Sequence, residues 1–163
     1  MAQLPNLTRM IRLADEFFGM RTDPDQISVD ETVMNRLRAI DPASLTDLSE
    51  PDGPIAWVLI FPTTTELMND FVSGRVNEKA LLDLTPVGIS YDAIYLCSAL
   101  VLPEHRRKGY AKQLTLSAVE SIRSRHPIKT LFVWAFSGEG DALARHVATE
   151  AGLPLKSRKR SHT

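Results

Sequence analysis

The sequence predicts an α/β fold in which a central sheet carries helices on both faces. Residues 55–61 and 93–102 are apolar on both faces, as strands buried inside a sheet are. A third apolar run, at residues 130–136, and several stretches with apolar side chains at helical spacing alternate with them. Helices and strands that alternate in this way favour a layered α/β architecture.

Two helices are expected before the first long strand. Residues 8–19 place their apolar side chains on one helical face. Residues 28–40 do the same, and Ser28 with Glu31 provides a capping box at the start. The polar stretch that follows leaves room for one short strand, at residues 45–48.

Further helices are expected between and after the strands. Thr63 and Glu66 repeat the capping-box spacing and begin a helical segment over residues 63–84. Another helix fills the interval between the second and third apolar runs. Asp141 caps the last helix, and Gly152 ends it.

Composition limits the class of protein. The chain of 163 residues suits a single domain over residues 1–163. Its net charge of −1 gives no overall field for nucleic acid, and no apolar run is long enough to span a membrane. The start lacks a signal-peptide pattern, Cys97 is the only cysteine, and the histidines lack metal-ligand spacing. We therefore expect a cytoplasmic protein with no metal, membrane or nucleic-acid partner.

The most informative stretch lies where the second apolar run gives way to a helix. Arg106, Arg107 and Lys108 gather cations there, and Gly109 lets a ligand approach the backbone closely. Peptide amides at a helix N-terminus have no partner in the helix, and the helix dipole favours negative charge. The stretch predicts a phosphate or diphosphate site; a solvated basic turn that only caps the helix is the alternative.

The fine pattern of this stretch is Arg106-x-x-Gly109-x-Ala111. It resembles the acyl-coenzyme A loop of the GNAT superfamily of N-acyltransferases, which reads Arg/Gln-x-x-Gly-x-Gly/Ala. The family's last helix often reads Asn-x-x-Ala-x-x-Leu-Tyr-x-x-x-Gly-Phe. The matching residues here are Asp141, Ala144, Val147, Ala148, Gly152 and Leu153. The resemblance covers residues 92–153 and implies a GNAT-like mixed, mostly antiparallel sheet with a splayed strand pair and helices on both faces.

The first half of the chain departs from the family pattern. The family usually opens with a strand, whereas this chain opens with a helix. The family usually places a hairpin strand where this chain has the helical segment 63–84. We expect that segment to be an insertion or a lid over the acceptor side. Residues 156–163 are expected to form a basic tail.

The resemblance implies acetyl-CoA, or another acyl-CoA, as the cofactor. Its pantetheine arm would add to the backbone of the strand, and an N–H near Leu100 or Val101 would hold the thioester carbonyl. Its diphosphate would lie on the amides of the loop, with the cationic side chains beside it. The cofactor-binding residues implied are Ala99, Leu100, Val101, Arg106, Arg107, Lys108, Gly109, Tyr110 and Ala111.

A general base is expected because the attacking amine must be neutral. An amine with a pKa near 10.4 is only about one part in a thousand neutral at pH 7.4. Some family members place a glutamate on the central strand, and the matching candidate here is Tyr95, which cannot act as a base at pH 7. The nearest carboxylates in the sequence are Asp92, Glu66 and Asp70.

A general acid is the second role that the resemblance implies. A tyrosine in the last helix often protonates the leaving thiolate, but Ala148 stands at that position here. Ser137 is the candidate substitute, with Tyr110 and His146 as alternatives. His146 lies about 200° around the helix from Ala148, so we expect it to face elsewhere. We also expect a tyrosine at position 148 to be tolerated.

The sequence therefore predicts an N-acyltransferase that moves an acetyl group to a primary amine by direct attack in a ternary complex. The acceptor could be a small molecule or a peptide, and a homodimer is left open. A coenzyme A-binding sensor with little or no catalysis is the main alternative. Nucleic-acid binding through residues 105–112 and 156–160 is disfavoured by the near-neutral charge.

Overall fold

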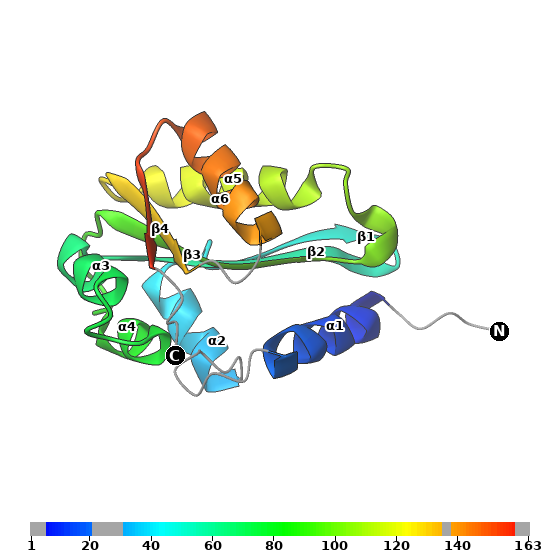
Figure 1. Ribbon diagram of the computed structural model, residues 1–163. Helices are drawn as coiled ribbons and strands as arrows, with labels where there is room; N and C mark the ends of the chain where they lie inside the picture. Colours follow the sequence, from blue (N-terminus) through cyan, green and yellow to red (C-terminus); the bar gives the residue numbers. More distant parts are fainter. Residues whose placement is uncertain (1–5, 21–30, 135–137, 159–163) are drawn as a thin grey trace.

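A five-stranded sheet forms the centre of the molecule (Figure 1). The computed structural model describes residues 6–20, 31–134 and 138–158. The strands lie side by side in chain order, β1-β2-β3-β4-β5. They are β1 (Leu45–Glu50), β2 (Gly53–Thr63), β3 (Ala93–Val101), β4 (Thr130–Trp134) and β5 (Leu155–Arg158).

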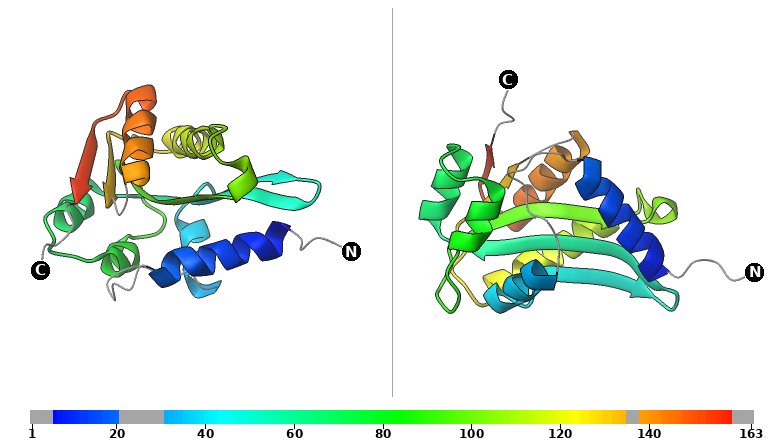
Figure 2. Two further views of the ribbon diagram at one scale, coloured as in Figure 1. Left: turned by 45° about the vertical axis from the view of Figure 1, so that its right-hand side comes forward. Right: turned by 90° about the horizontal axis from the view of Figure 1, so that it is seen from below.

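Helices cover both faces of this sheet, as the sequence predicts. They are α1 (Asn6–Met20), α2 (Glu31–Ile40), α3 (Thr65–Val72), α4 (Glu78–Leu84), η1 (Pro103–His105), α5 (Tyr110–Arg123) and α6 (Gly138–Ala151). α5 and α6 pack on one face, and α1 and α2 lie on the other (Figure 1). Figure 2 shows α1 lying across β2 and β3, whereas α3 and α4 gather at the end of the sheet beside β5.

The sheet is mixed. β1 and β3 both run antiparallel to β2, and β4 and β5 continue parallel to β3. The antiparallel part carries the longer ladder, as expected. Within the described residues β4 pairs with Ala93–Leu96 of β3, and the part of β3 from Ser98 to Val101 has a strand neighbour on one side alone. The pairing of β3 with β4 thus ends part-way along β3, which agrees with the splayed strand pair that the family resemblance implies.

The start of α3 is one residue later than the capping-box spacing suggests. Thr63 is the last residue of β2, fully buried, and its hydroxyl hydrogen-bonds with the hydroxyl of Thr85 at 2.7 Å. Thr64 is the N-cap, and its Oγ1 accepts a hydrogen bond from the Leu67 amide at 3.2 Å. The prediction of Thr63 as the cap was wrong because burial extends β2 through that residue.

The last helix and strand also differ from the sequence prediction. α6 begins at Gly138, so Asp141 lies inside it and pairs with Arg145 one turn on. Gly152 has a φ of +69° and ends α6 as predicted. Leu155–Arg158 form β5, whereas the basic tail was expected to begin at residue 156; residues 159–163 lie outside the described part.

The predicted helices at the start of the chain are present with small shifts. α1 is longer than residues 8–19 at both ends, and α2 is described from Glu31 to Ile40. Ser28 lies outside the described residues, so its capping role stays a prediction. The segment between β2 and β3 is helical, as α3 and α4, and β2 pairs directly with β3.

A buried carboxylate joins helices from the two faces of the sheet. Asp41 follows α2, is only 2% exposed, and accepts a hydrogen bond from the Ala43 amide at 2.8 Å. Arg125, just beyond α5, donates to both carboxylate oxygens, at 2.6 and 3.1 Å. This pair raises the pKa of Arg125 through its hydrogen bond to Asp41. The Nε2 atom of His126 lies 3.4 Å from the same carboxylate.

Candidate functional site

The edge of β3 that faces away from β2, free of a strand partner beyond Cys97 in the described residues, presents every second peptide group. The Leu102 amide donates to the Ile55 carbonyl of β2 at 2.9 Å. Backbone groups alternate in direction along a strand, so Leu100 also turns its N–H and C=O toward β2, and Ala99 and Val101 turn theirs toward the free edge. The Val101 carbonyl agrees with this, because it accepts from Arg106 Nε at 3.0 Å rather than from β2. The register favours Val101 over Leu100 as a donor to a ligand on this edge.

The turn after β3 has two left-handed residues close together. Arg107 has a φ of +64°, the one non-glycine residue with positive φ in the described chain, and Gly109 has a φ of +81°. A left-handed non-glycine residue costs about 1 kcal/mol or more, so the surrounding structure must hold Arg107 in place. Alternating backbone conformations of this kind turn successive N–H groups into one concave surface, which binds anions.

The N-terminus of α5 extends that surface. Its first helical hydrogen bond is donated by the Gln113 amide to the Gly109 carbonyl at 2.9 Å. For the preceding amides, from Arg107 to Lys112, the described part of the chain offers no acceptor. The Arg107 and Lys108 side chains are exposed beside them. Unpaired amides, the helix dipole and two cations together form a site for a phosphate or diphosphate.

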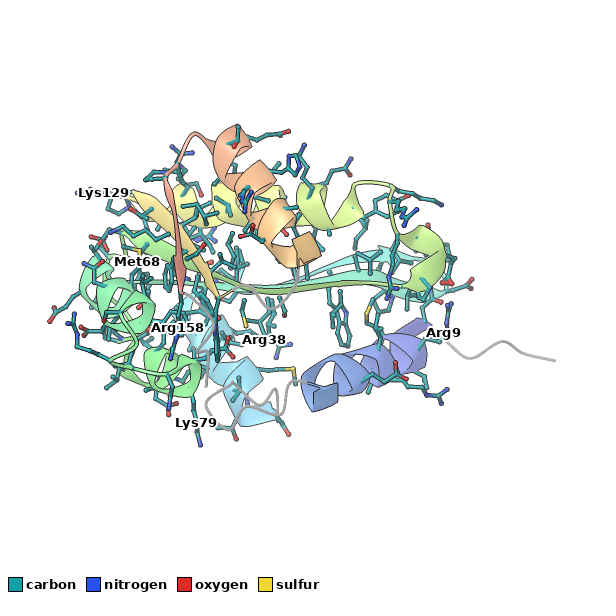
Figure 3. The ribbon with its side chains drawn as sticks, in the orientation of Figure 1. Arg9, Arg38, Met68, Lys79, Lys129 and Arg158 are labelled. Carbon is teal, nitrogen blue, oxygen red and sulfur yellow. The ribbon has the colours of Figure 1, made fainter. Side chains whose placement is uncertain are left out.

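A salt bridge holds α1 against this turn. The guanidinium of Arg9 in α1 donates hydrogen bonds to both carboxylate oxygens of Glu104 in η1, at 2.6 Å to Oε1. The hydrogen bond from Arg9 lowers the pKa of the Glu104 carboxyl. Figure 3 shows Arg9 on the side of α1 that faces η1. Both side chains remain partly exposed, so the pair positions the helix more than it stabilises the fold.

Tyr95 is held away from the free edge of β3. It is fully buried, and its ring contacts Phe61, Phe71 and Phe132. Its hydroxyl donates a hydrogen bond to a carboxylate that sequence analysis missed, that of Glu78 at the start of α4. The pattern around Glu78 gave no signal, because an acidic residue after an Asn77 cap is ordinary helix-start chemistry.

The three carboxylates that the sequence suggested as bases either stabilise local structure or face solvent. Asp92 Oδ1 accepts from the Thr65 amide at 2.7 Å and so fixes the start of α3. Asp70 pairs with Arg75 at 3.0 Å, and Glu66 is exposed on α3. Asp92 directly precedes β3, so these three lie toward the end of the strand opposite the basic turn.

The structure describes two of the three general-acid candidates, Tyr110 and His146. Ser137 lies outside the described residues. Tyr110 opens α5, half-buried, with its ring 6.2 Å from the ring of His105. His146 is exposed on α6 whereas Ala148 is 5% exposed in the core, so His146 faces away from it as predicted.

The burial of Ala148 corrects the expectation that a tyrosine would be tolerated there. Ala148 packs in the main hydrophobic cluster and is only 5% exposed, so a phenol ring there would have to displace its neighbours. We expect Ala148→Tyr to lower the free energy of unfolding by about 1–3 kcal/mol, the usual cost of overpacking. Urea unfolding would measure it, with Ala142→Tyr on the exposed side of α6 as the control. Equal stability of the two variants would contradict the phase of α6.

Two further classes of site were sought in the described residues. No three His, Cys, Asp or Glu side chains of that part stand close enough together to hold a metal ion. None of its helices is long and apolar enough to cross a membrane.

Comparison with known proteins agrees with this geometry. The model of the "Acetyltransferase (GNAT) family" matches residues 12–152, which is most of the chain. The protein belongs to the GNAT acetyltransferase family. No curated protein sequence matches the chain.

The GNAT fold is also seen in a solved structure. The crystal structure of Chaetomium thermophilum Naa20 in complex with a bisubstrate analogue is similar, with a TM-score of 0.50 and 15% sequence identity. The match covers 78% of this chain and 60% of that one, so this chain spans about three fifths of the Naa20 chain. At this identity the likeness concerns the fold.

Proposed function

We propose that this protein transfers an acyl group, most simply acetyl, from coenzyme A to an amine. One observation carries the proposal. In the part of the chain that the structure describes, the edge of β3 beyond its pairing with β4 runs directly into a turn with cationic side chains, where the amides from Arg107 to Lys112 find no acceptor. An extended arm with a diphosphate at one end matches both halves of this surface. Membership of the GNAT acetyltransferase family supports the same activity.

The residues present fit acyl-CoA. Ala99, through its N–H and C=O, and Val101, through its N–H, would hold the extended pantetheine arm at the free edge. The amides from Arg107 to Ala111, with the Arg107 and Lys108 side chains, would bind the diphosphate. Arg106 would act mainly on the protein itself, since its guanidinium is bound to the Val101 carbonyl.

The same edge supplies the electrostatic part of the chemistry. An N–H of Ala99 or Val101 that holds the thioester carbonyl would stabilise negative charge as it develops on that oxygen. Most of the acceleration would come from holding the thioester and the amine together. The acyl group supplies the electrophile, and the protein supplies alignment and charge stabilisation.

The acceptor is proposed to be a primary amine on a small molecule or a peptide. It would approach from the face of α1 and α2, with the α3–α4 segment as an insertion or lid beside it. The crystallised Naa20 complex contains a bisubstrate analogue, which supports a mechanism in which both substrates are bound together. Residues 21–30 and 135–137 lie outside the described part and carry none of this argument.

The activity is tested by thiol release from acetyl-CoA against a panel of amines. The panel should contain polyamines, aminoglycosides, lysine derivatives and short peptides with free N-termini. We expect amine-dependent thiol release above the hydrolysis measured without amine, with the acetylated amine found by mass spectrometry. A rate of thiol release that no amine in the panel increases would contradict the proposal.

A coenzyme A-binding sensor is the second candidate. It is favoured by Tyr95, which lies buried at the position of the family's glutamate, and by Ala148 at the position of the family's tyrosine. Calorimetric binding of acetyl-CoA without turnover of any amine would support the sensor over the enzyme.

A further inference from the structure

One acidic residue stands in the basic segment that follows β3. Residues 103–112 contain four arginine and lysine side chains and one carboxylate, that of Glu104. A carboxylate beside a diphosphate site lowers the local positive potential and so disfavours the anion. Glu104 is not part of the anion-binding surface described above. A role in the position of the turn would explain a carboxylate at this place.

Glu104 is bound by a residue of the first helix, 95 positions earlier in the chain. The Arg9 guanidinium donates to both carboxylate oxygens, and this hydrogen bonding is the main reason that the pKa of Glu104 is lowered. Two hydrogen bonds between a guanidinium and a carboxylate fix the relative orientation of the two groups as well as their distance. This paired geometry is the case in which a partly exposed ion pair has a measurable effect.

Arg9 is itself fixed to the sheet. Its Nη1 donates to Asn6 Oδ1 at 3.3 Å, and the backbone amide of Asn6 donates to the Asp52 carbonyl, between β1 and β2, at 3.1 Å. Met10, the next residue, is fully buried in the cluster that contains Leu102. The Arg9 guanidinium therefore extends from a firmly packed part of α1, on the side that faces η1 (Figure 3).

The short helix η1 passes this restraint on to the turn. Glu104 is its middle residue, and the amides of His105 and Arg106 donate to carbonyls three residues earlier, at 2.9 and 3.3 Å. A single turn of 3₁₀ helix has poor hydrogen-bond geometry and little stability of its own. The left-handed Arg107 follows two residues after η1. The direction of the amides from Arg107 onward therefore depends on contacts from outside η1, and Glu104 supplies such a contact.

We propose that Arg9, through Glu104, is a positioning residue for the diphosphate of the cofactor. The pair holds η1 so that the amides from Arg107 onward keep the concave arrangement that an anion needs. The proposal rests on the acyl-CoA function proposed above, and it adds a contribution from α1, which lies outside the loop motif. The pair acts on the affinity for the diphosphate and not on the reacting atoms.

The first test removes the arginine and measures binding by calorimetry. Arg9→Met should raise the dissociation constant of acetyl-CoA about fivefold, the upper end of what a partly exposed ion pair contributes. Acetyl-pantetheine, which lacks the diphosphate, should bind the wild type and the variant equally, and the thermal midpoint should fall by less than about 4 °C. Arg9→Lys keeps the charge without the two-oxygen geometry and should lose about twofold. Arg12→Met, which removes the same charge from an exposed position of α1, is the control and should bind like the wild type.

The second test depends on the sign of an effect. Glu104→Gln removes a negative charge from beside a diphosphate site, so charge alone predicts tighter binding of acetyl-CoA. A positioning role predicts the opposite, a dissociation constant about threefold higher, because a neutral amide cannot hold the guanidinium in two charged hydrogen bonds. Combining it with Arg9→Met should cost no more than Arg9→Met alone, since the two residues act as one unit. In the thiol-release assay, KM for acetyl-CoA should rise with the dissociation constant while kcat stays unchanged.

Several results would overturn the assignment. Wild-type affinity in Arg9→Met, or tighter binding in Glu104→Gln, would show that the pair does not position the turn. An equal loss for acetyl-pantetheine and acetyl-CoA would show a general disturbance of the site. An equal loss in Arg12→Met would assign the effect to the net charge of α1. A wild-type protein that does not bind acetyl-CoA at all removes the proposed function, and this proposal with it.

Discussion

Reversing two charges in the turn after β3, by Arg107→Glu with Lys108→Glu, is expected to weaken acetyl-CoA binding at least about a hundredfold. Both side chains are exposed, and the described chain gives neither a hydrogen bond nor an ion pair, so the fold should not change. A hydrogen bond to a charged group contributes about 1.5–3 kcal/mol, so two lost contacts cost about 3 kcal/mol or more. That energy corresponds to about a hundredfold in the dissociation constant.

Calorimetry on matched variants separates a local effect from an overall change of charge. Arg38→Glu with Lys129→Glu makes the same change of net charge at exposed positions away from the turn (Figure 3). That control should bind acetyl-CoA with wild-type affinity. Acetyl-pantetheine, which lacks the diphosphate, should bind the wild type and the turn variant equally. Equal acetyl-CoA affinity of turn variant and control would remove the diphosphate assignment.

The sheet could be predicted because its long strands can be recognised from short stretches of sequence. β2 and β3 are buried on both faces over most of their length, so their apolar runs stand out in the sequence. β5 gave no such signal. Of its four residues only Leu155 is apolar, and Arg158 belongs to the fold through its contacts with the Phe71 and Trp134 rings. Those contacts join distant segments, which a local pattern cannot show.

The parts of the candidate site also differ in how far they could be predicted from local sequence. The anion-binding turn is built by consecutive residues, so Gly109 and its cationic neighbours were visible in sequence. The choice between Leu100 and Val101 needed the register with β2. Glu78 needed the packing of α4 against β3, because 17 residues separate it from Tyr95. When side chains from separate elements come together only in the fold, the sequence around each of them does not show the contact.

Removing the buried carboxylate between α2 and α5, by Asp41→Ala, is expected to be the most damaging single change to stability. Asp41 is 2% exposed and holds the Arg125 guanidinium in two hydrogen bonds. The Arg125 side chain is itself 39% exposed, so water can solvate its charge, and the loss comes from the hydrogen bonds that the buried carboxylate accepts from Arg125 and from the Ala43 amide. At about 1.5–3 kcal/mol for each hydrogen bond to a charged group, we expect a loss of about 3–5 kcal/mol. For a chain of this length that loss lowers the thermal midpoint by about 10 °C.

A second change distinguishes the lost pair from the lost helix end. Asp41→Asn keeps the acceptor for the Ala43 amide, and combining it with Arg125→Met removes the stranded charge as well. The double variant should recover at least half of the lost stability, because it keeps the acceptor for the buried Ala43 amide and leaves no guanidinium that has lost its acceptor. Asp83→Ala, at an exposed position of α4, serves as the control, with a midpoint near the wild type. An Asp41→Ala midpoint within about 1 °C of that control would show that α2 and α5 are held together by apolar packing alone.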